Sequence, residues 1–439
     1  MMRNQMKVVL FTILLGVLLV ACSNPTAPTS IGPDSQGVNR QTGTSASSSD
    51  SKPAAKQVKP LDVPPPPDFK CGNPTDLLSD DSALQACLDA GGEIKLHPGS
   101  PGYVVNGLNG NFGQGLILNR SGTVLTSSAP PLRATIIAGR DLFSHILATQ
   151  PFVGANNFSI SFISFNGMVD EVRSDGAYRR ARDTCFDPGG NFGNLFLEGN
   201  DFKFFNNEST HAMCGSGLGI LGSRFKIENN YIAHNGRDRF TKNFGGVPWS
   251  DGMTVLSCEG GYIARNVIVD NTDIDLVVGG GRNCVVELNK IAHYGKYAFA
   301  GLNVGNFNDR GNHVGSEFRE NIVYSATRNR LSIGILVGSH PWTSKVDVRY
   351  AGKVYNNIVH GSVINLVVDG VYGGEVVSNK VFDNNGDQGL GDCGDSLNYA
   401  VHPPHVSNTT LQSGWISYQY DGDIACGFNS VRNLPRLIR

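Results

Sequence analysis

Short apolar runs separated by turn residues fill most of the chain. They predict β-strands of four or five residues at 217–221, 252–255, 274–278, 301–304, 333–337 and 364–368. Between them an Asn-x-[Ile/Val/Phe] unit recurs at Asn200, Asn230, Asn266, Asn289, Asn321, Asn357 and Asn379. Successive asparagines are 22 to 36 residues apart, which indicates one structural coil of about 22 residues carrying loops of variable length.

These spacings predict an all-β fold, a right-handed parallel β-helix. Each coil would supply two or three strands, coils would stack about 4.8 Å apart, and alternate side chains would fill the axial core. The asparagines are expected in turns, stacked as a ladder along the axis. A β-propeller needs about 40–45 residues per blade, so the shortest steps are too short for one.

One helix is expected before the repeats begin. Ser79 or Asp80 can cap it, Leu84, Cys87 and Leu88 lie on one helical face, and Gly91-Gly92 ends it. The next residues, 93–99, predict a short strand that ends in a turn. This helix would close the N-terminal end of the solenoid.

The first seventy residues predict export. A short basic start and an apolar run of about 14 residues form a signal peptide over 1–21, too short to span a bilayer comfortably. Leu19-Val20-Ala21-Cys22 resembles the lipobox of bacterial lipoproteins, which implies cleavage before Cys22, acylation of its thiol and anchoring to a membrane, with the outer membrane as the expected location. An ordinary signal peptide with a chance cysteine is the alternative. Residues 22–70 are rich in Ser, Thr and Pro and read as a disordered tether, leaving 71–439 for the β-helix domain.

Residues 81–99 also carry a resemblance to a known family. The segment DSALQACLDAGGEIKLHPG is similar to the N-terminal cap of pectate-lyase-like β-helix proteins, a superfamily that includes polygalacturonases. The later Asn-x-[Ile/Val] coils look like the generic repeats of that superfamily. The resemblance implies a right-handed parallel β-helix over roughly 71–405, and it says less about activity, because this fold carries lyases, hydrolases, epimerases, phage tailspikes and non-catalytic proteins.

The charge composition argues against nucleic acid as a partner. The chain has 36 basic and 38 acidic residues and a net charge of −2, which gives no electrostatic attraction to nucleic acid. Glycine accounts for 54 of the 439 residues, which suits a fold with many tight turns. We expect a monomer without a required cofactor.

The cysteines predict disulfides. Apart from Cys22 there are eight, an even number in an exported chain, and no Cys-x-x-Cys pair suggests structural zinc. Sequential pairing is expected, and for Cys258 and Cys284 a pair of reduced thiols in the core is the alternative. The expected bridges are Cys71–Cys87, Cys185–Cys214, Cys258–Cys284 and Cys393–Cys426.

An acidic cluster offers the best candidate chemistry. Asp251 begins one predicted strand, and Asp273 and Asp275 flank the start of the strand one coil later. Alternation with inward Ile274 and Leu276 would place Asp273 and Asp275 on the outer face, about 6.6 Å apart. Repulsion between neighbouring carboxylates raises the pKa of one of them, so one can act as a general acid and the other as a general base. Two alternatives stay open, that these residues cap turns or that they bind calcium. Asn271-Thr272-Asp273 is similar to the Asn-Thr-Asp motif of polygalacturonases, but the Asp-Asp, Gly-His-Gly and Arg-Ile-Lys motifs that follow it in that family are not found here.

Basic and aromatic side chains near this cluster could bind a glycan. The candidates are Arg237, Arg239, Lys242 and Trp249 in the insertion 234–249, with Arg328 and Arg330 further along. Cations recognise uronate or sulfate groups and aromatic rings stack on sugars, whereas a plain solvated loop is the alternative. His211, His293 and His340 are candidate acid–base groups, although histidines in turns are more often structural. We therefore expect an envelope protein that binds or acts on an extracellular polysaccharide, as a hydrolase, lyase or epimerase, or else a non-catalytic surface protein.

Overall fold

The structure is a computed structural model. It describes residues 69–107, 115–142, 144–149, 153–169, 193–237, 250–307, 311–326, 330–338, 348–382, 397–401, 406–414 and 416–417. Residues from Phe69 onwards form one compact unit. In the described residues no helix has the length and apolar character to cross a membrane.

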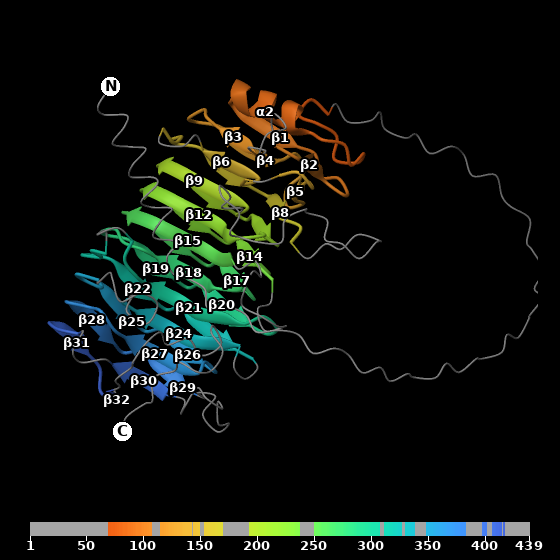
Figure 1. Cartoon of the computed structure of the whole chain (residues 1–439). Helices are drawn as coiled ribbons and strands as arrows, with labels where there is room; N and C mark the ends of the chain where they lie inside the picture. The colour runs from red at the N-terminus through yellow and green to blue at the C-terminus, as the bar shows by residue number, and fades with distance from the viewer. Residues whose placement is uncertain are drawn as a thin grey trace, which may run out of the picture. The chain divides into compact units, whose positions relative to one another are not determined.

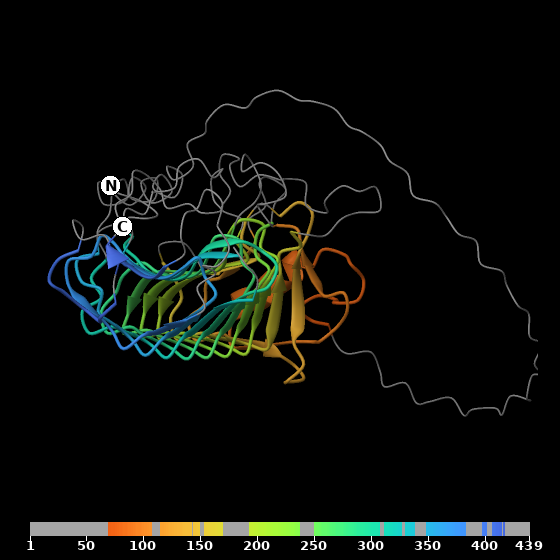
Figure 2. The same ribbon diagram turned by 90° about the horizontal axis from the view of Figure 1, so that it is seen from below.

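Three parallel sheets wind around one core, which confirms the predicted parallel β-helix (Figure 1). Each coil contributes one strand to each sheet in turn, and every strand pairs with the equivalent strands of the coils before and after it. Figure 2 shows the coils from below, aligned one behind another. We name the sheets after their first strands.

The β1 sheet has eleven strands among the described residues. They are β1 Glu93–Leu96, β4 Val124–Ser127, β7 Ser159–Ser161, β10 Lys203–Phe205, β13 Lys226–Glu228, β16 Tyr262–Ala264, β19 Val285–Glu287, β22 Glu317–Arg319, β25 Lys353–Tyr355, β28 Gly374–Val377 and β31 Thr409–Leu411.

The β2 sheet has ten strands in the described ranges. They are β2 Tyr103–Val105, β5 Ala134–Ala138, β8 Ile163–Asn166, β11 Glu208–Thr210, β14 Tyr231–Ala233, β17 Val267–Val269, β20 Lys290–His293, β23 Ile322–Ser325, β26 Ile358–His360 and β29 Lys380–Phe382.

The β3 sheet, again counted over the described residues, has eleven strands and holds all six strands that the apolar runs predicted. They are β3 Leu116–Leu118, β6 Leu147–Thr149, β9 Leu195–Asn200, β12 Gly215–Ser223, β15 Ser250–Glu259, β18 Ile274–Val278, β21 Ala298–Val304, β24 Leu331–Val337, β27 Ile364–Val368, β30 Leu397–Val401 and β32 Ile416–Ser417.

The predicted cap helix is α2, Asp81–Ala90, and it ends at Gly91 as expected. Leu84 and Leu88 join the core, and Cys87 is bridged to Cys71 with the Cα atoms 5.8 Å apart. Asp80 makes no side-chain capping bond to the helix. Its carboxylate instead accepts hydrogen bonds from the backbone N–H groups of Asn73 and Val104, so it ties the helix to strand β2.

The predicted asparagine ladder lies where the chain passes from the β1 sheet to the β2 sheet, a turn we call the asparagine corner. From Asn230 to Asn357, the side-chain amide of each ladder asparagine donates a hydrogen bond to Oδ1 of the ladder asparagine in the next coil. The backbone N–H of the same donor residue donates to that oxygen as well. The residue before each ladder asparagine has a φ of 56–58°. The ladder members are Asn207, Asn230, Asn266, Asn289, Asn321, Asn357 and Asn379.

The ladder position is therefore confirmed for six of the seven predicted asparagines, and the prediction for Asn200 is wrong. Asn200 ends β9 in the β3 sheet and bonds with Asn156, whereas Asn207 holds the ladder position. The unit at Asn207 has Ser209 where the pattern requires Ile, Val or Phe, so the pattern did not include Asn207.

Two of the predicted disulfides are confirmed, Cys71–Cys87 and Cys258–Cys284, the latter with Cα atoms 5.5 Å apart. Cys214 is also disulfide-bonded. Cys22, Cys185, Cys393 and Cys426 lie outside the described residues, so the pairings predicted for the last three stay predictions.

Candidate functional site

The connections from the β2 sheet to the β3 sheet differ greatly in length, and we call this turn the variable corner. It takes the chain from Asn166 to Leu195 in one coil and from Ala233 to Ser250 in another, but only from Val269 to Ile274 in the next. Asn235 stacks on Asn271 across two coils of this corner, but the insertions around them differ in length from coil to coil. The acidic cluster predicted from the sequence lies at this corner.

Asp251 lies at the start of β15, where its carboxylate accepts two hydrogen bonds. The Thr254 hydroxyl donates to Oδ2 at 2.6 Å, and the Ile274 N–H of the neighbouring strand donates to Oδ1 at 3.1 Å. Ser216 lies one coil earlier, with its hydroxyl 2.7 Å from that of Thr254. Because the Thr254 proton points to Asp251, Ser216 completes a chain of hydroxyls along the β3 sheet.

Asp273 immediately precedes β18, beside the strand that Asp251 begins. The backbone carbonyl of Asp273 accepts the N–H of Phe299 at 2.7 Å, which fixes the main chain at this point. The side chains of Asp251 and Asp273 are each 8 % exposed. The structure therefore places Asp251 and Asp273 at the starts of adjacent strands, in neighbouring coils as the sequence predicted, but Asp273 is nearly buried instead of lying on the outer face.

The outer-face position predicted for Asp275 is wrong. This side chain is 0 % exposed, and its carboxylate bonds with Asn271 at 2.9 Å and with His293 at 2.5 Å. A Cβ added at Gly252, one coil earlier, would meet Ile268 of the β2 sheet, which shows that this row of the strand points into the corner between the sheets. Strict alternation fails here because the chain is still turning from one sheet into the next.

His293 ends β20 and is fully buried beside Asp275. Its Nδ1–H donates to the carbonyl of Lys296 at 2.9 Å, which fixes the imidazole orientation and leaves Nε2 facing the Asp275 carboxylate. Asp270 lies 3.6 Å from Nδ1 and accepts the backbone N–H groups of residues 294–296. The turn after β20 is thus organised around two carboxylates and one imidazole.

The buried pair holds a proton strongly. Burial raises the pKa of the Asp275 carboxyl, against the opposing effects of His293 and Asn271. Burial alone would lower the pKa of His293, but the nearby Asp275 carboxylate, with smaller contributions from the Lys296 carbonyl and Asp270, raises it above its ordinary value. The raised pKa of His293 and the raised pKa of Asp275 both favour one proton retained between Nε2 of His293 and Oδ2 of Asp275.

The predicted cationic residues are only partly within the described chain. Arg237 donates from Nε and Nη2 to the carbonyl of Val169 at 3.1 and 3.0 Å, which joins two coils. The Arg330 guanidinium lies 4.0 Å from the centre of the Tyr297 ring. Arg239, Lys242, Trp249 and Arg328 lie outside the described residues, as does His340.

Sequence reasoning missed several members of this site. It did not connect His293 with Asp275, and it did not single out Thr254, Ser216 or Asp270. The spacing held one signal, because Asp270 and His293 are 23 residues apart, about one coil. The described residues contain no group of three or more acidic, histidine or cysteine side chains placed to hold a metal ion.

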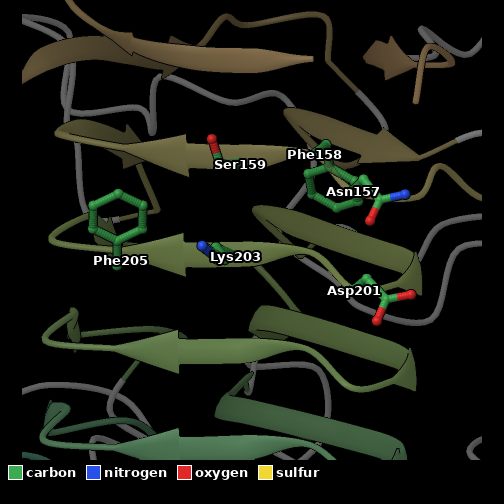
Figure 3. Close-up of a pocket in the computed structure, with 6 residues that line it drawn as sticks. All are labelled: Asn157, Phe158, Ser159, Asp201, Lys203 and Phe205. Carbon is green, nitrogen blue, oxygen red and sulfur yellow. The ribbon is translucent and has the colours of Figure 1, made fainter. Parts of the chain in front are cut away.

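A second concave feature lies on the outer face of β7 and β10. These strands belong to the β1 sheet, whereas Asp251 and Asp273 lie at the starts of β3-sheet strands. Figure 3 shows this pocket of about 370 Å³, with Asn157 and Asp201 at one end, Phe205 at the other and Lys203 between them. Asp201 forms a bidentate ion pair with Arg224, at 2.7 and 2.6 Å. The pocket therefore offers a cation and an aromatic ring for binding but no pair of carboxylates for chemistry.

Comparison with known proteins supports the fold. No protein-family model matches the sequence, and no curated protein matches it. Among solved structures, the A-module of a mannuronan C-5 epimerase, AlgE6 of Azotobacter vinelandii, matches with a TM-score of 0.52 at 15 % identity over 79 % of this chain and 93 % of that one. An alginate lyase from Paenibacillus sp. matches with a TM-score of 0.48 at 15 % identity, over 74 % of this chain and 97 % of that one. The match to the epimerase A-module, at this low identity, shows a shared β-helix architecture alone.

Proposed function

We propose that this protein acts on an extracellular polysaccharide at the variable corner, with Asp251 and Asp273 as its acid–base pair. The observation that carries the proposal is the placement of two carboxylic acids, each 8 % exposed, at the starts of adjacent β3-sheet strands. Nearly buried acids in neighbouring positions favour different protonation states, which acid–base catalysis requires. The A-module of similar fold belongs to a mannuronan C-5 epimerase, which is consistent with this substrate class.

The contacts of the two acids suggest their roles. Both oxygens of Asp251 accept hydrogen bonds, as an ionised carboxylate does, so Asp251 suits the base that takes a proton from water. Asp273 would then donate its proton to the glycosidic oxygen as the bond to the sugar carbon breaks. Water adds to that carbon, and one new reducing end forms for each bond cleaved.

Asp275 has a positioning role in this proposal. Its side chain is 0 % exposed and is shared between Asn271 and His293, so it does not reach a substrate. The pair instead fixes the turn at 270–275, on which the Asp273 carboxylate depends. Arg237, Arg330 and the other predicted cations would contact acidic groups of the glycan.

A panel of purified polysaccharides tests the proposal. The full chain is incubated with neutral and uronate polymers, and both new reducing ends and the ultraviolet absorbance of unsaturated uronate are followed. Reducing ends without absorbance are the expected result. Reducing ends with absorbance would replace hydrolysis by β-elimination, and nuclear magnetic resonance of the products would detect epimerisation. A calcium requirement, the remaining alternative for the acidic cluster, would appear as activity lost on chelation and restored by Ca²⁺.

Non-catalytic glycan binding is the second candidate function. It is favoured by the hydrogen bonds that already occupy both oxygens of Asp251 and by the complete burial of Asp275. On this account the same acids hold the corner together. Saturable binding to a polymer in the panel, with no change in that polymer over long incubation, would select this candidate.

We also propose that the protein is a monomeric lipoprotein of the cell envelope, anchored through Cys22 and held away from the membrane by residues 22–70. Replacing Cys22→Ser should abolish acylation and release the protein into the soluble fraction or leave its precursor uncleaved. Metabolic labelling with a palmitate analogue, followed by membrane fractionation, measures both effects. Identical labelling and fractionation of parent and variant would contradict the anchor.

A further inference from the structure

A row of aromatic rings starts just after the end of β20 and continues along the outer face of β23, β26 and β29 in the β2 sheet. Tyr294, Tyr324, His360 and Phe382 come from successive coils, and we call them the aromatic strip. The centroids of neighbouring rings lie 6.1, 5.1 and 5.1 Å apart. Tyr294 is 56 % exposed and Phe382 is 45 % exposed, so the strip ends in accessible rings on both sides.

The strip belongs to a wider surface with a distinct charge. Strands β17, β20, β23, β26 and β29 turn Ile268, Ile291, Val323 and Val359 into the core, and their alternate residues face outwards. These outward positions include two lysines, Lys290 and Lys380, and no carboxylate. The outward residues are Val267, Val269, Lys290, Ala292, Ile322, Tyr324, Ile358, His360, Lys380 and Phe382.

We propose that the aromatic strip and its two lysines bind an extended uronate polysaccharide, parallel to the axis of the β-helix. One ring per coil gives a row of aromatic contacts with neighbouring centroids 5.1 to 6.1 Å apart, a spacing close to the length of one sugar unit. Tyr324 and His360 stack on each other at 29°, and the other two neighbouring pairs meet edge to face at 61° and 72°. Sugars therefore pack on the exposed parts of these rings, and the ammonium groups of Lys290 and Lys380 pair with carboxylates of the polymer. This surface lies on a different sheet from Asp251 and can bind whether or not those acids are catalytic.

A second copy of the chain fits this surface less well. In a two-fold arrangement each patch would meet itself, so Lys290 and Lys380 would approach the same lysines of the other copy without an acidic outward residue to neutralise them. A polyanion satisfies both lysines while covering the rings. The charge of the strip therefore favours a uronate polymer over self-association.

The experiment measures affinity for polygalacturonate and alginate oligosaccharides, with neutral cello-oligosaccharides as the reference, by titration calorimetry on the full chain. The double variant Tyr324→Ala/Phe382→Ala should weaken uronate binding about tenfold or more. Tyr350→Ala is the matched control, since it removes a ring that is 37 % exposed and lies outside the β2 sheet, and it should leave the affinity unchanged. Lys290→Gln/Lys380→Gln changes only exposed side chains, so it tests the surface without risk to the fold, and it should weaken binding and reduce its salt dependence.

Four results would overturn the proposal: no binding of either uronate polymer by the parent chain, undiminished binding by the lysine variant, equal affinity for neutral oligosaccharides, or concentration-dependent dimerisation that the strip variants abolish. Failure of the proposed function is separate. If Asp251→Asn/Asp273→Asn and the parent both lack turnover while strip-dependent binding persists, the proposed hydrolysis fails and the aromatic strip stands.

Discussion

The asparagine corner leads into each strand of the β2 sheet and the variable corner leads out of it, but the two corners use polar side chains differently. At the asparagine corner each coil repeats one turn, and one ladder asparagine satisfies the backbone and side chain of its neighbour. At the variable corner, Asp251, Asp273 and Asp275 lie in three different environments within two coils. The comparison teaches that repetition stabilises the fold, whereas departure from repetition creates positions where chemistry can occur.

Removing one ladder side chain should have the largest effect on stability. Asn289→Ala removes the acceptor of both the Asn266 N–H and the Asn266 side-chain amide, and it removes the donor to the Ile263 carbonyl and to Oδ1 of Asn321. Buried polar groups left unpaired cost about 1–3 kcal/mol each, so the free energy of unfolding should fall by about 3–5 kcal/mol. Guanidinium denaturation measures the change.

Asn200→Ala is the matched control for the ladder, because Asn200 bonds in a partly buried position outside it. Its loss should cost about 1 kcal/mol or less. Equal destabilisation by Asn200→Ala and Asn289→Ala would show that the ladder has no special role in holding the coils together.

The buried pair at the variable corner should make stability depend on pH. The folded protein retains the proton between His293 and Asp275, whereas unfolded His293 releases its proton above a pKa of 6.5. The folded state then binds more protons than the unfolded state, so the free energy of unfolding should fall by about 1.4 kcal/mol per pH unit above pH 6.5, up to the raised pKa of the pair. Below pH 6.5 this contribution is fully present.

Asp275→Asn should reverse this dependence. The new amide can donate to Nε2 of a neutral His293 and still accept from Asn271, so the folded histidine carries no charge. Stability would then fall as the pH drops below 6.5, when unfolded His293 gains its proton. Denaturation of parent and variant across this range gives the two slopes, and parallel slopes would exclude proton retention by the pair.

The smallest expected change is a gain at the asparagine corner. Leu288 is exposed and has a φ of 57°, a conformation that strains most side chains and that asparagine tolerates. Leu288→Asn should raise the free energy of unfolding by about 0.5–1 kcal/mol. Leu288→Ala keeps the Cβ and should bring no such gain. Equal effects of the two replacements on the free energy of unfolding would contradict the claim that the backbone of Leu288 is strained.

The difference between the repeated asparagine corner and the irregular variable corner also explains how well the sequence predicts each of them. The β3-sheet strands and six ladder asparagines could be predicted, because apolar runs and Asn-x-[Ile/Val] units repeat with the coil. The partnership of Asp275 with His293 could not, since insertions of different length hide which residues become neighbours. The inward direction of Asp275 was also hidden, because the alternation of a strand holds only after the chain has finished turning.

The most direct test of the central claim measures turnover and stability together for Asp273→Asn, in the same preparation as the parent. If the variable corner carries the chemistry, turnover on the polysaccharide that the parent cleaves should fall at least about 10²-fold while the melting temperature stays unchanged. Undiminished turnover, or a loss of activity that only follows a loss of folding, would contradict the account and return Asp273 to a structural role at the corner.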